Sequence, residues 1–213
     1  MARPRTDIQP RIIVSARRCF ARSGVDGSTL RQIAKGARTS IGMVYYYFPT
    51  KEDLFQAVVE DVYSNLLADL QAVLKGPATI EERIVRLYQR VGEASELELL
   101  TLRLVVREML VSSELRVKLM ERFKRGHLGL VQQALGEAVR EGQVRTDVSK
   151  AVLLITTLAI GAVPQFMIKA MGNASPFIDA PQGEALAREL LSVWLHGLAP
   201  QAQNNKSHQT RPS

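Results

Sequence analysis

Residues 39–55, with the sequence TSIGMVYYYFPTKEDLF, contain three consecutive tyrosines that a phenylalanine and a proline follow directly. On a helix, successive side chains are about 100° apart, so the three tyrosine rings spread over roughly 200° of the circumference. One packed face cannot bury all three, which argues against a purely core-filling role. An outward phenol can contact a thymine methyl group, stack along a sugar–phosphate backbone, or donate its hydroxyl to a phosphate. The segment therefore has the residue types of a nucleic-acid contact.

The positive charge of the chain is concentrated in the same region. The formal net charge is +7, and residues 1–51 contain ten Lys and Arg but only two acids. The rest of the chain is almost neutral. A solvated basic face is one interpretation of this pattern, and a head that binds a polyanion is the other.

The overall composition excludes several classes of protein. With 46% hydrophobic and 23% charged residues among 213, the chain has the composition of an ordinary globular protein. A single cysteine, Cys19, excludes an internal disulfide framework and suits a reducing compartment. The first ten residues, MARPRTDIQP, lack the apolar segment of a signal peptide. We expect a cytoplasmic protein.

Short helices are expected to position the aromatic segment. Apolar spacing predicts a helix over residues 9–23, which a glycine ends. Thr29 and Gln32 have the spacing of a capping box, so a second helix is predicted to begin there and to break near Gly36.

The aromatic segment itself is predicted to form a third helix and the start of a fourth. Thr39 or Ser40 can cap the third helix, which must end before Pro49 because proline disfavours a helical conformation in the preceding residue. Thr50 is predicted to cap a long fourth helix that the KGP sequence at 75–77 ends.

The remaining sequence is also predicted to be helical, so the fold class is all-α. The sequence contains no convincing alternation of apolar and polar residues, as a β-strand would show, and no internal repeat. The expected helices cover residues 79–91, 96–111, 114–141, 149–171 and 182–198. We divide the chain into an N-terminal domain of short helices at 1–50 with a flexible arm at 1–8, a larger helical domain at 51–199, and a disordered tail at 200–213.

Residues 151–168 contain no charge over 18 positions, which is the lower limit for a membrane-spanning helix. Two threonines, a proline and a glutamine reduce the total hydrophobicity of this segment. We favour a helix buried by the core and by a partner subunit, and we expect no membrane association.

The three N-terminal helices have the layout of a helix-turn-helix. TLRQIAKG, ARTS and SIGMVYYYF supply the first helix, the turn and the second helix, which in this motif enters the DNA major groove. Packing between the two helices is predicted to use four apolar residues, Ile33, Ala34, Val44 and Phe48. This packing leaves Ser40, Ile41, Gly42 and some of the tyrosines exposed.

Residues 9–60 resemble the TetR family of bacterial transcriptional regulators, through IIVSARRCFARSGVDGSTLRQIA and SIGMVYYYFPTKEDLFQAVVE. Beyond residue 60 only the all-helical layout is similar. The resemblance implies a homodimer in which each subunit has a three-helix DNA-binding head and a larger helical domain with an effector pocket. It also implies a dimer interface made chiefly by the last two long helices, at about 149–171 and 182–198.

The resemblance also implies roles for individual residues. Bases or adjacent sugars would be contacted by Ser40, Ile41, Gly42 and Tyr45, with Arg31 reaching a base edge from the preceding helix. Phosphates would be held by Thr29, Tyr46, Tyr47 and Lys51. For Lys51 there is an independent reason, because a cation and free backbone amides at one helix start favour a phosphate.

Two turn residues and one residue of the recognition helix depart from the family pattern. Arg38 stands where a small residue, often glycine, is usual, and Thr39 replaces the usual aliphatic residue. Arg38 is either an added phosphate contact or a solvated turn residue. Ile41 stands where a polar residue is common, which indicates either a thymine methyl contact or an incidental apolar surface residue.

An effector pocket is expected among the middle helices. The candidate lining residues are Met109, Phe123, His127, Phe166 and Met167, although methionine and phenylalanine at helical spacing are more often plain core. His127 has no ligand partner at metal spacing, and we expect no metal site and no cofactor.

No catalytic motif is present, so we expect a regulator and not an enzyme. The function that the sequence favours is a ligand-responsive DNA-binding regulator that represses transcription. It would bind a palindromic operator in double-stranded DNA as a homodimer, and a small-molecule effector would release it. The alternatives are a constitutive activator or architectural DNA-binding protein without an effector, an enzyme with an incidental basic head, and a membrane-surface protein.

Overall fold

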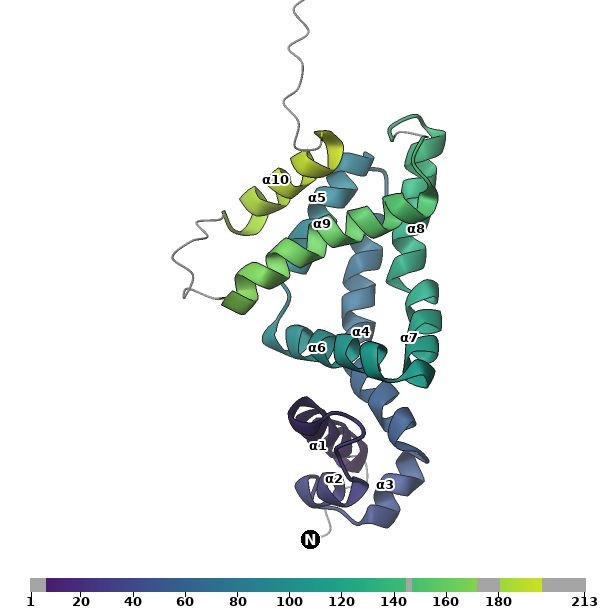
Figure 1. Cartoon of the computed structure of the whole chain (residues 1–213), viewed down its shortest axis with the longest axis vertical. Helices are drawn as coiled ribbons and strands as arrows, with labels where there is room; N and C mark the ends of the chain where they lie inside the picture. The colour runs from purple at the N-terminus through teal and green to yellow at the C-terminus, as the bar shows by residue number, and fades with distance from the viewer. Residues whose placement is uncertain (1–6, 145–146, 172–180, 197–213) are drawn as a thin grey trace, which may run out of the picture.

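The computed structural model describes residues 7–144, 147–171 and 181–196, and every regular element in those ranges is an α-helix. The all-α prediction is thereby confirmed. Three short helices form a head at one end of the molecule (Figure 1). These helices are α1 (Ile8–Ser23), α2 (Leu30–Gly36) and α3 (Ile41–Tyr47). The predicted tail at 200–213 and most of the predicted arm lie outside the described residues.

A long helix, α4 (Lys51–Leu74), runs from the head into a larger body (Figure 1). Among the described residues, six further helices form the body, and α6 crosses it at the end nearest the head (Figure 1). They are α5 (Ile80–Gly92), α6 (Glu96–Val111), α7 (Ser113–Arg125), α8 (His127–Arg140), α9 (Lys150–Met171) and α10 (Gly183–His196).

Side-chain caps fix where the helices of the head and body begin. The Thr29 side chain accepts from the Gln32 amide while the Gln32 side chain accepts from the Thr29 amide, which is the predicted capping box of α2. Thr50 and Asp53 form the same arrangement at the start of α4. Two further boxes begin α5 and α6. Because these interactions span only three residues, the sequence contained the information needed to place these starts.

One predicted helix is wrong, because residues 114–141 form two helices. The helix is interrupted at Gly126, which separates α7 from α8. The hydroxyl oxygen of Tyr63, on α4, accepts a hydrogen bond from the His127 amide at 3.0 Å and also lies 2.8 Å from the Nδ1 atom of that ring. A side chain at position 126 would overlap the Tyr63 hydroxyl. The break is therefore the point at which α4 contacts the backbone of the α7–α8 connection.

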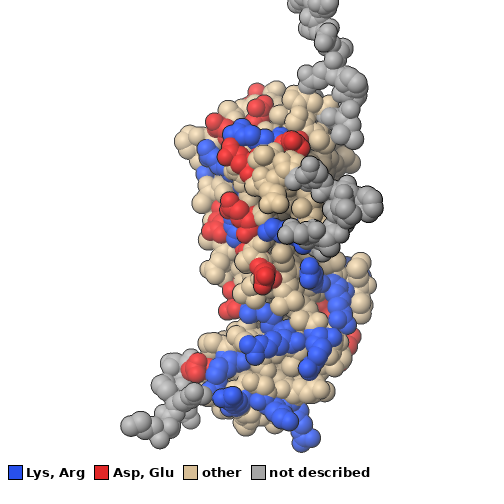
Figure 2. All heavy atoms as spheres, turned by 90° about the vertical axis from the view of Figure 1, so that its left-hand side faces the viewer, with Lys and Arg blue, Asp and Glu red and all other residues tan. Residues whose placement is uncertain are grey.

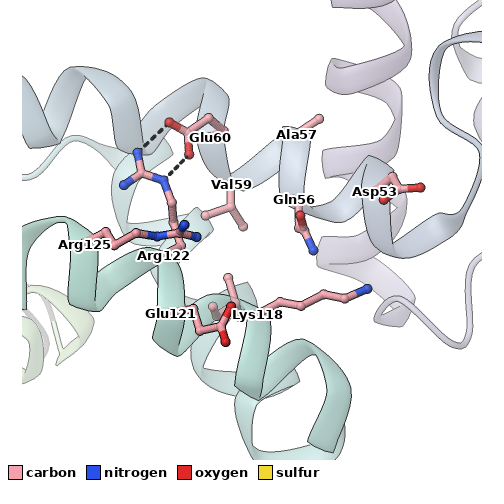
Figure 3. Close-up of a pocket in the computed structure, with 10 residues that line it drawn as sticks. Asp53, Gln56, Ala57, Val59, Glu60, Lys118, Glu121, Arg122 and Arg125 are labelled. Atoms are coloured by element: carbon pink, nitrogen blue, oxygen red, sulfur yellow. Dashed lines mark hydrogen bonds and ion pairs between the residues drawn. The ribbon is translucent and has the colours of Figure 1, made fainter.

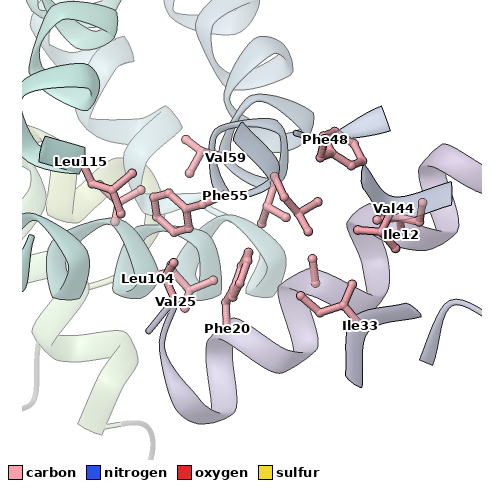
Figure 4. Close-up of a cluster of buried hydrophobic side chains, with 14 of the residues drawn as sticks. Ile12, Phe20, Val25, Ile33, Val44, Phe48, Phe55, Val59, Leu104 and Leu115 are labelled. Atoms are coloured by element: carbon pink, nitrogen blue, oxygen red, sulfur yellow. The ribbon is translucent and has the colours of Figure 1, made fainter. Parts of the chain in front are cut away.

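The apolar side chains form two cores. The first, which we call the head core, joins α1–α3 to the start of α4 and includes Phe20, Phe48 and Phe55 (Figure 4). It also contains Leu104 from α6 and Leu115 from α7, so the body contributes to it. The second, the body core, joins the far half of α4 to α5, α8, α9 and α10.

Helix α9 is, in the described part of the chain, long and apolar enough to cross a membrane by length and composition. Its inner face makes polar contacts with the body. The hydroxyl of Thr157 accepts from the Trp194 indole at 2.8 Å, and the Gln165 amide donates to the Tyr88 carbonyl at 2.8 Å. Both threonine and glutamine are buried in these contacts. The outer face of α9 is exposed in the single chain.

Candidate nucleic-acid interface

The packing of α2 against α3 determines which residues of the head face outward. The predicted packing is confirmed, because Ile33, Ala34, Val44 and Phe48 are all buried. Helix α3 has only two turns, so burial of Val44 at its centre turns the opposite face to solvent. The exposed surface of α3 and its cap, which we call the outward face, carries Ser40, Ile41, Gly42, Tyr45 and Tyr46.

The tyrosine run is divided between surface and core. Tyr45 is 52% exposed and Tyr46 is 77% exposed, which is unusual for large rings. Tyr47 is half-buried, with its ring centre 5.2 Å from that of Tyr46 in an edge-on arrangement and 6.4 Å from that of Phe48. Tyr47 therefore supports the exposed Tyr46 ring, and Phe48 anchors the end of α3 in the head core.

Two hydroxyl groups cap the helices of the motif at its surface. The Thr29 oxygen accepts from the Gln32 amide at 3.2 Å, and the Ser40 oxygen accepts from the Met43 amide at 3.2 Å. Each hydroxyl uses its oxygen as an acceptor for the helix, so its hydrogen can be donated outward. Both side chains are thus held in a fixed direction at the exposed ends of α2 and α3.

The turn between α2 and α3 contains a residue in the left-handed backbone conformation. Arg38 has φ of +52°, and outside the glycines it is the residue with positive φ in the described ranges. Its amide bonds to the Lys35 carbonyl at 3.1 Å and the Thr39 amide bonds to the Ala34 carbonyl at 3.0 Å. This pair of bonds is the Schellman motif, in which glycine is favoured at the left-handed position.

The two departures in the turn have a structural meaning in this motif. Arg38 occupies the position that favours glycine and carries backbone strain there, while its exposed side chain extends from the turn. The residue after it in a Schellman motif often makes an apolar contact back to the helix, which Thr39 replaces with a polar side chain. The Arg38 carbonyl accepts from the Arg11 guanidinium at 3.2 Å, so α1 helps to hold this turn.

Lys51 is engaged inside the head and not presented as a free cation. Its ammonium group donates to the carbonyls of Val25 at 2.9 Å, Ser28 at 3.1 Å and Asp26 at 3.3 Å. An ammonium has three donors, so these three acceptors match its capacity. Sequence reasoning missed this arrangement, because the acceptors are backbone atoms 23 to 26 residues earlier in the chain.

Basic side chains cover much of the head. Figure 2 shows Lys and Arg gathered over the head and the adjoining part of the body, with most of the visible Asp and Glu farther away. Exposed cations of α1 and α2 are Arg18, Arg22, Arg31 and Lys35. Arg17 is different, because it is buried and forms an ion pair with Asp61 of α4. Arg17, one of the ten basic residues at positions 1–51, thus joins the head to α4 and is not available to a ligand.

The five predicted pocket residues are not brought together at one site. Phe123 and His127 pack with Tyr63, with ring centres 5.0 to 5.6 Å apart. Met109 packs against the head core. On α9, Phe166 is half-buried and Met167 is 54% exposed. Burial and the nearby Arg122 charge lower the pKa of His127 to about 4, so this ring is neutral at pH 7.

The structure has an open hollow of about 520 Å³ between α4 and α7, and none of the five predicted pocket residues line it (Figure 3). Its walls are mostly charged. Glu60 accepts two hydrogen bonds from the Arg122 guanidinium, at 2.7 and 2.9 Å, while Lys118 and Arg125 extend along the α7 side. The hydrogen bonds with Glu60 raise the pKa of Arg122. Sequence reasoning did not predict this surface, where acids of α4 lie opposite the mostly basic residues of α7.

No group of three or more His, Cys, Asp or Glu side chains with the arrangement of a metal site occurs among the residues described. The exposed side of the head carries hydroxyls, phenols, guanidinium groups and the Lys35 ammonium group. These groups donate hydrogen bonds and positive charge, and they are suited to phosphates and base edges.

Comparisons with known proteins agree with this geometry. Residues 12–58 match the model of a family described as bacterial regulatory proteins, tetR family. The chain is 28% identical over 193 residues to the HTH-type transcriptional repressor AcnR of Corynebacterium glutamicum, a match that covers 86% of this chain and 95% of the relative. It is 22% identical over 180 residues to the HTH-type transcriptional regulator UidR of Escherichia coli K12, covering 81% of this chain and 89% of the relative.

A solved structure shares the fold over nearly the whole chain. The transcriptional regulator FadR from Bacillus subtilis, in complex with stearoyl-CoA, superposes with a TM-score of 0.69 at 21% identity. The superposition covers 89% of this chain and 99% of that one. The similarity therefore extends from the head through the helical body.

Proposed function

We propose that this chain, which belongs to the TetR family of bacterial transcriptional regulators, represses transcription by binding a palindromic operator as a homodimer. A small-molecule effector that binds the body would release it from DNA. The protein would act in the bacterial cytoplasm and be associated with the nucleoid while bound to DNA.

The outward face of α3 is the observation that carries the proposal. Ile41, Tyr45 and Tyr46 are 43%, 52% and 77% exposed on a head whose inner side chains are fully packed. Exposed rings and an exposed aliphatic side chain on a short, rigid helix match what a major groove offers, namely thymine methyls, sugars and phosphate oxygens. The surrounding Lys and Arg supply the long-range attraction to DNA.

Within this proposal, the residues of the interface have different roles. Ser40, Ile41, Gly42 and Tyr45 would face bases or sugars, and Arg31 would reach a base edge. The sugar–phosphate backbone of the DNA would be contacted by Thr29, Arg38, Thr39, Tyr46 and Tyr47. Lys51 would contribute only if its ammonium group exchanged one of its carbonyl partners for a phosphate.

The outer face of α9 supports the proposed dimer. Val152, Ile155, Val163 and Met167 are 53%, 66%, 53% and 54% exposed. At about 100° per residue these four positions fall within an arc of roughly 120°, so they form one apolar stripe along the helix. A stripe of this kind is suited to burial against the same helix of a second subunit, with α10 beside it.

The contact between α4 and the body supports control by an effector. Tyr63 of α4 meets Phe123 and His127 at the α7–α8 break, so a ligand that displaced these rings would move α4. Helix α4 begins directly after α3, and its movement would change the separation of two heads on DNA. A coupling free energy of about 1–3 kcal/mol, common for allosteric proteins, would weaken operator binding roughly 5- to 150-fold.

The proposal is tested by selecting duplexes from a random-sequence DNA pool with the full-length protein. We expect an enriched, approximately palindromic sequence, and two chains per duplex by the mass of the complex. Tyr45→Ala should weaken binding to the selected duplex by about 1–3 kcal/mol per subunit, as the loss of a base contact does. Leu97→Ala, a matched control at a 42% exposed apolar residue of the body, should not change binding. Failure to enrich any sequence would contradict the proposal.

A further inference from the structure

A loop between α1 and α2, residues 24–28, is held by side chains from outside the three-helix head. We propose that Glu108, on α6 of the body, is a positioning residue for DNA binding that acts through this loop. This inference rests on the proposed function for its link to DNA, but the contact itself can be measured without DNA.

The Glu108 carboxylate is buried at the junction of head and body. Its Oε1 atom accepts a hydrogen bond from the Val25 amide at 3.2 Å, and the residue is only 3% exposed. Val25 is 1% exposed and belongs to the head core together with Leu104, one helical turn before Glu108 (Figure 4). A buried amide without this acceptor would lose its hydrogen bond and gain no water.

Arg107, the neighbouring residue of α6, contacts the end of α1 and the first residue of the same loop. Arg107 donates to the Ser23 carbonyl at 3.3 Å, and a β-carbon at Gly24 would lie 2.5 Å from the Arg107 guanidinium nitrogen. Gly24 also has φ of +74°, which disfavours any other residue. A β-carbon at Gly24 would require the Arg107 side chain to move, so the positive φ is the main reason for a glycine at this position.

Lys51 of α4 also holds the loop. Its ammonium group binds the carbonyls of Val25, Asp26 and Ser28, while Glu108 binds the Val25 amide. The backbone of this loop is thus fixed between a cation at the start of α4 and a carboxylate of α6. Neither contact depends on the helix-turn-helix itself.

The position of the loop matters because it leads directly into α2. Ser28 is 2% exposed, donates to the Gly24 carbonyl at 2.7 Å, and precedes Thr29, the residue that caps α2. A shift of α6 relative to the head would break the Glu108 contact and release the residue before this cap. The body can therefore influence the helix-turn-helix through α6, in addition to its influence through α4.

The test compares Glu108→Ala with Glu108→Gln in the full-length protein. The glutamine keeps an acceptor oxygen for the Val25 amide, whereas the alanine removes it. Glu121→Ala, at an exposed acid of α7, serves as the control for loss of a charge. The readouts are hydrogen exchange of the Val25 amide, followed by NMR, and affinity for the duplex selected with the wild-type protein.

We expect Glu108→Ala to accelerate exchange at Val25 and to weaken DNA binding roughly 5- to 100-fold, because only the fraction of molecules with an ordered loop would bind. Glu108→Gln should retain most of the slow exchange at Val25 and most of the DNA affinity, and Glu121→Ala should alter neither.

Three results would overturn the inference. One is rapid exchange of the Val25 amide in the wild-type protein, which decides the matter even if the alanine variant does not fold. Another is unchanged DNA affinity in a folded Glu108→Ala variant whose exchange is accelerated. The third is a glutamine variant as impaired as the alanine variant. If the wild-type protein selects no duplex, the proposed function fails, while the exchange data still report on the contact.

Discussion

Replacement of Lys51 by methionine distinguishes a structural role of this residue from a role in holding phosphate. Methionine keeps most of the length of the side chain and removes the ammonium group. The wild-type ammonium donates to three carbonyls of the 24–28 loop at 2.9 to 3.3 Å. If these bonds are its main role, Lys51→Met destabilises the folded protein before any DNA is added.

The magnitude follows from the surroundings of the three bonds. A hydrogen bond to a charged group contributes about 1.5–3 kcal/mol when it is well buried. These bonds are partly exposed or exposed, and the released carbonyls can bind water. The sum is therefore about 1–3 kcal/mol, which for a chain of this length lowers the Tm by roughly 2–10 °C.

Two assays separate the roles. Thermal unfolding at equal chain concentration measures the destabilisation, because dimerisation makes the Tm depend on concentration. The salt dependence of binding to the selected duplex counts phosphate contacts, since each lost contact reduces the slope of log affinity against log salt by about 0.9. We expect a lower Tm and an unchanged slope. Lys35→Met, at an exposed lysine of α2, is the control for stability and should leave the Tm unchanged.

The reasoning is refuted if Lys51→Met unfolds at the wild-type temperature and its salt slope becomes smaller. That result would mean that the ammonium leaves the carbonyls and binds phosphate in the complex.

Three other substitutions or conditions test the rest of the structure. Arg38→Gly should stabilise the protein by about 0.5–1 kcal/mol in denaturant unfolding, because it relieves the left-handed strain, whereas Arg38→Ala should give no gain. Burial lowers the pKa of His127 from 6.5 to about 4, so the unfolded chain binds a proton first, and stability should fall by about 3 kcal/mol as the pH drops from 6.5 towards 4. A pH dependence that is the same in His127→Gln would contradict this assignment. Gly126→Ala should cost about 1–3 kcal/mol by overlap with the Tyr63 hydroxyl. Tyr63→Phe in the same chain should recover part of that loss, and strictly additive effects would argue against the contact.

Local signals in the sequence predicted the helices of the head well. The capping boxes at Thr29 and Thr50 join residues three apart, and Pro49 restricts its immediate neighbour, so the bounds of α2, α3 and α4 followed from short segments. The angular spread of the tyrosines likewise predicted that some rings would be exposed, and two of them are.

Contacts between distant parts of the chain were not predictable in this way. The carbonyls that bind Lys51 are backbone groups, which have no sequence signature, and the carboxylate of Glu108 meets Val25 across 83 residues. The break at Gly126 depends on Tyr63 of another helix, so a continuous helical pattern concealed it. The expected pocket stays a prediction, because methionine and phenylalanine fill cores and line cavities with equal ease.

The head core has a consequence for how this protein can be divided or recombined. A boundary at residue 50 passes between Phe48 and Phe55, which are buried in the same core, and Leu104 and Leu115 of the body complete that core. The match to the family model ends at residue 58, within the buried part of α4. A chimaera that joined this head to a different body after residue 50 would expose apolar surface on both sides of the junction. Modular exchange of specificity would therefore need a graft that carries the first turns of α4 together with matching faces of α6 and α7.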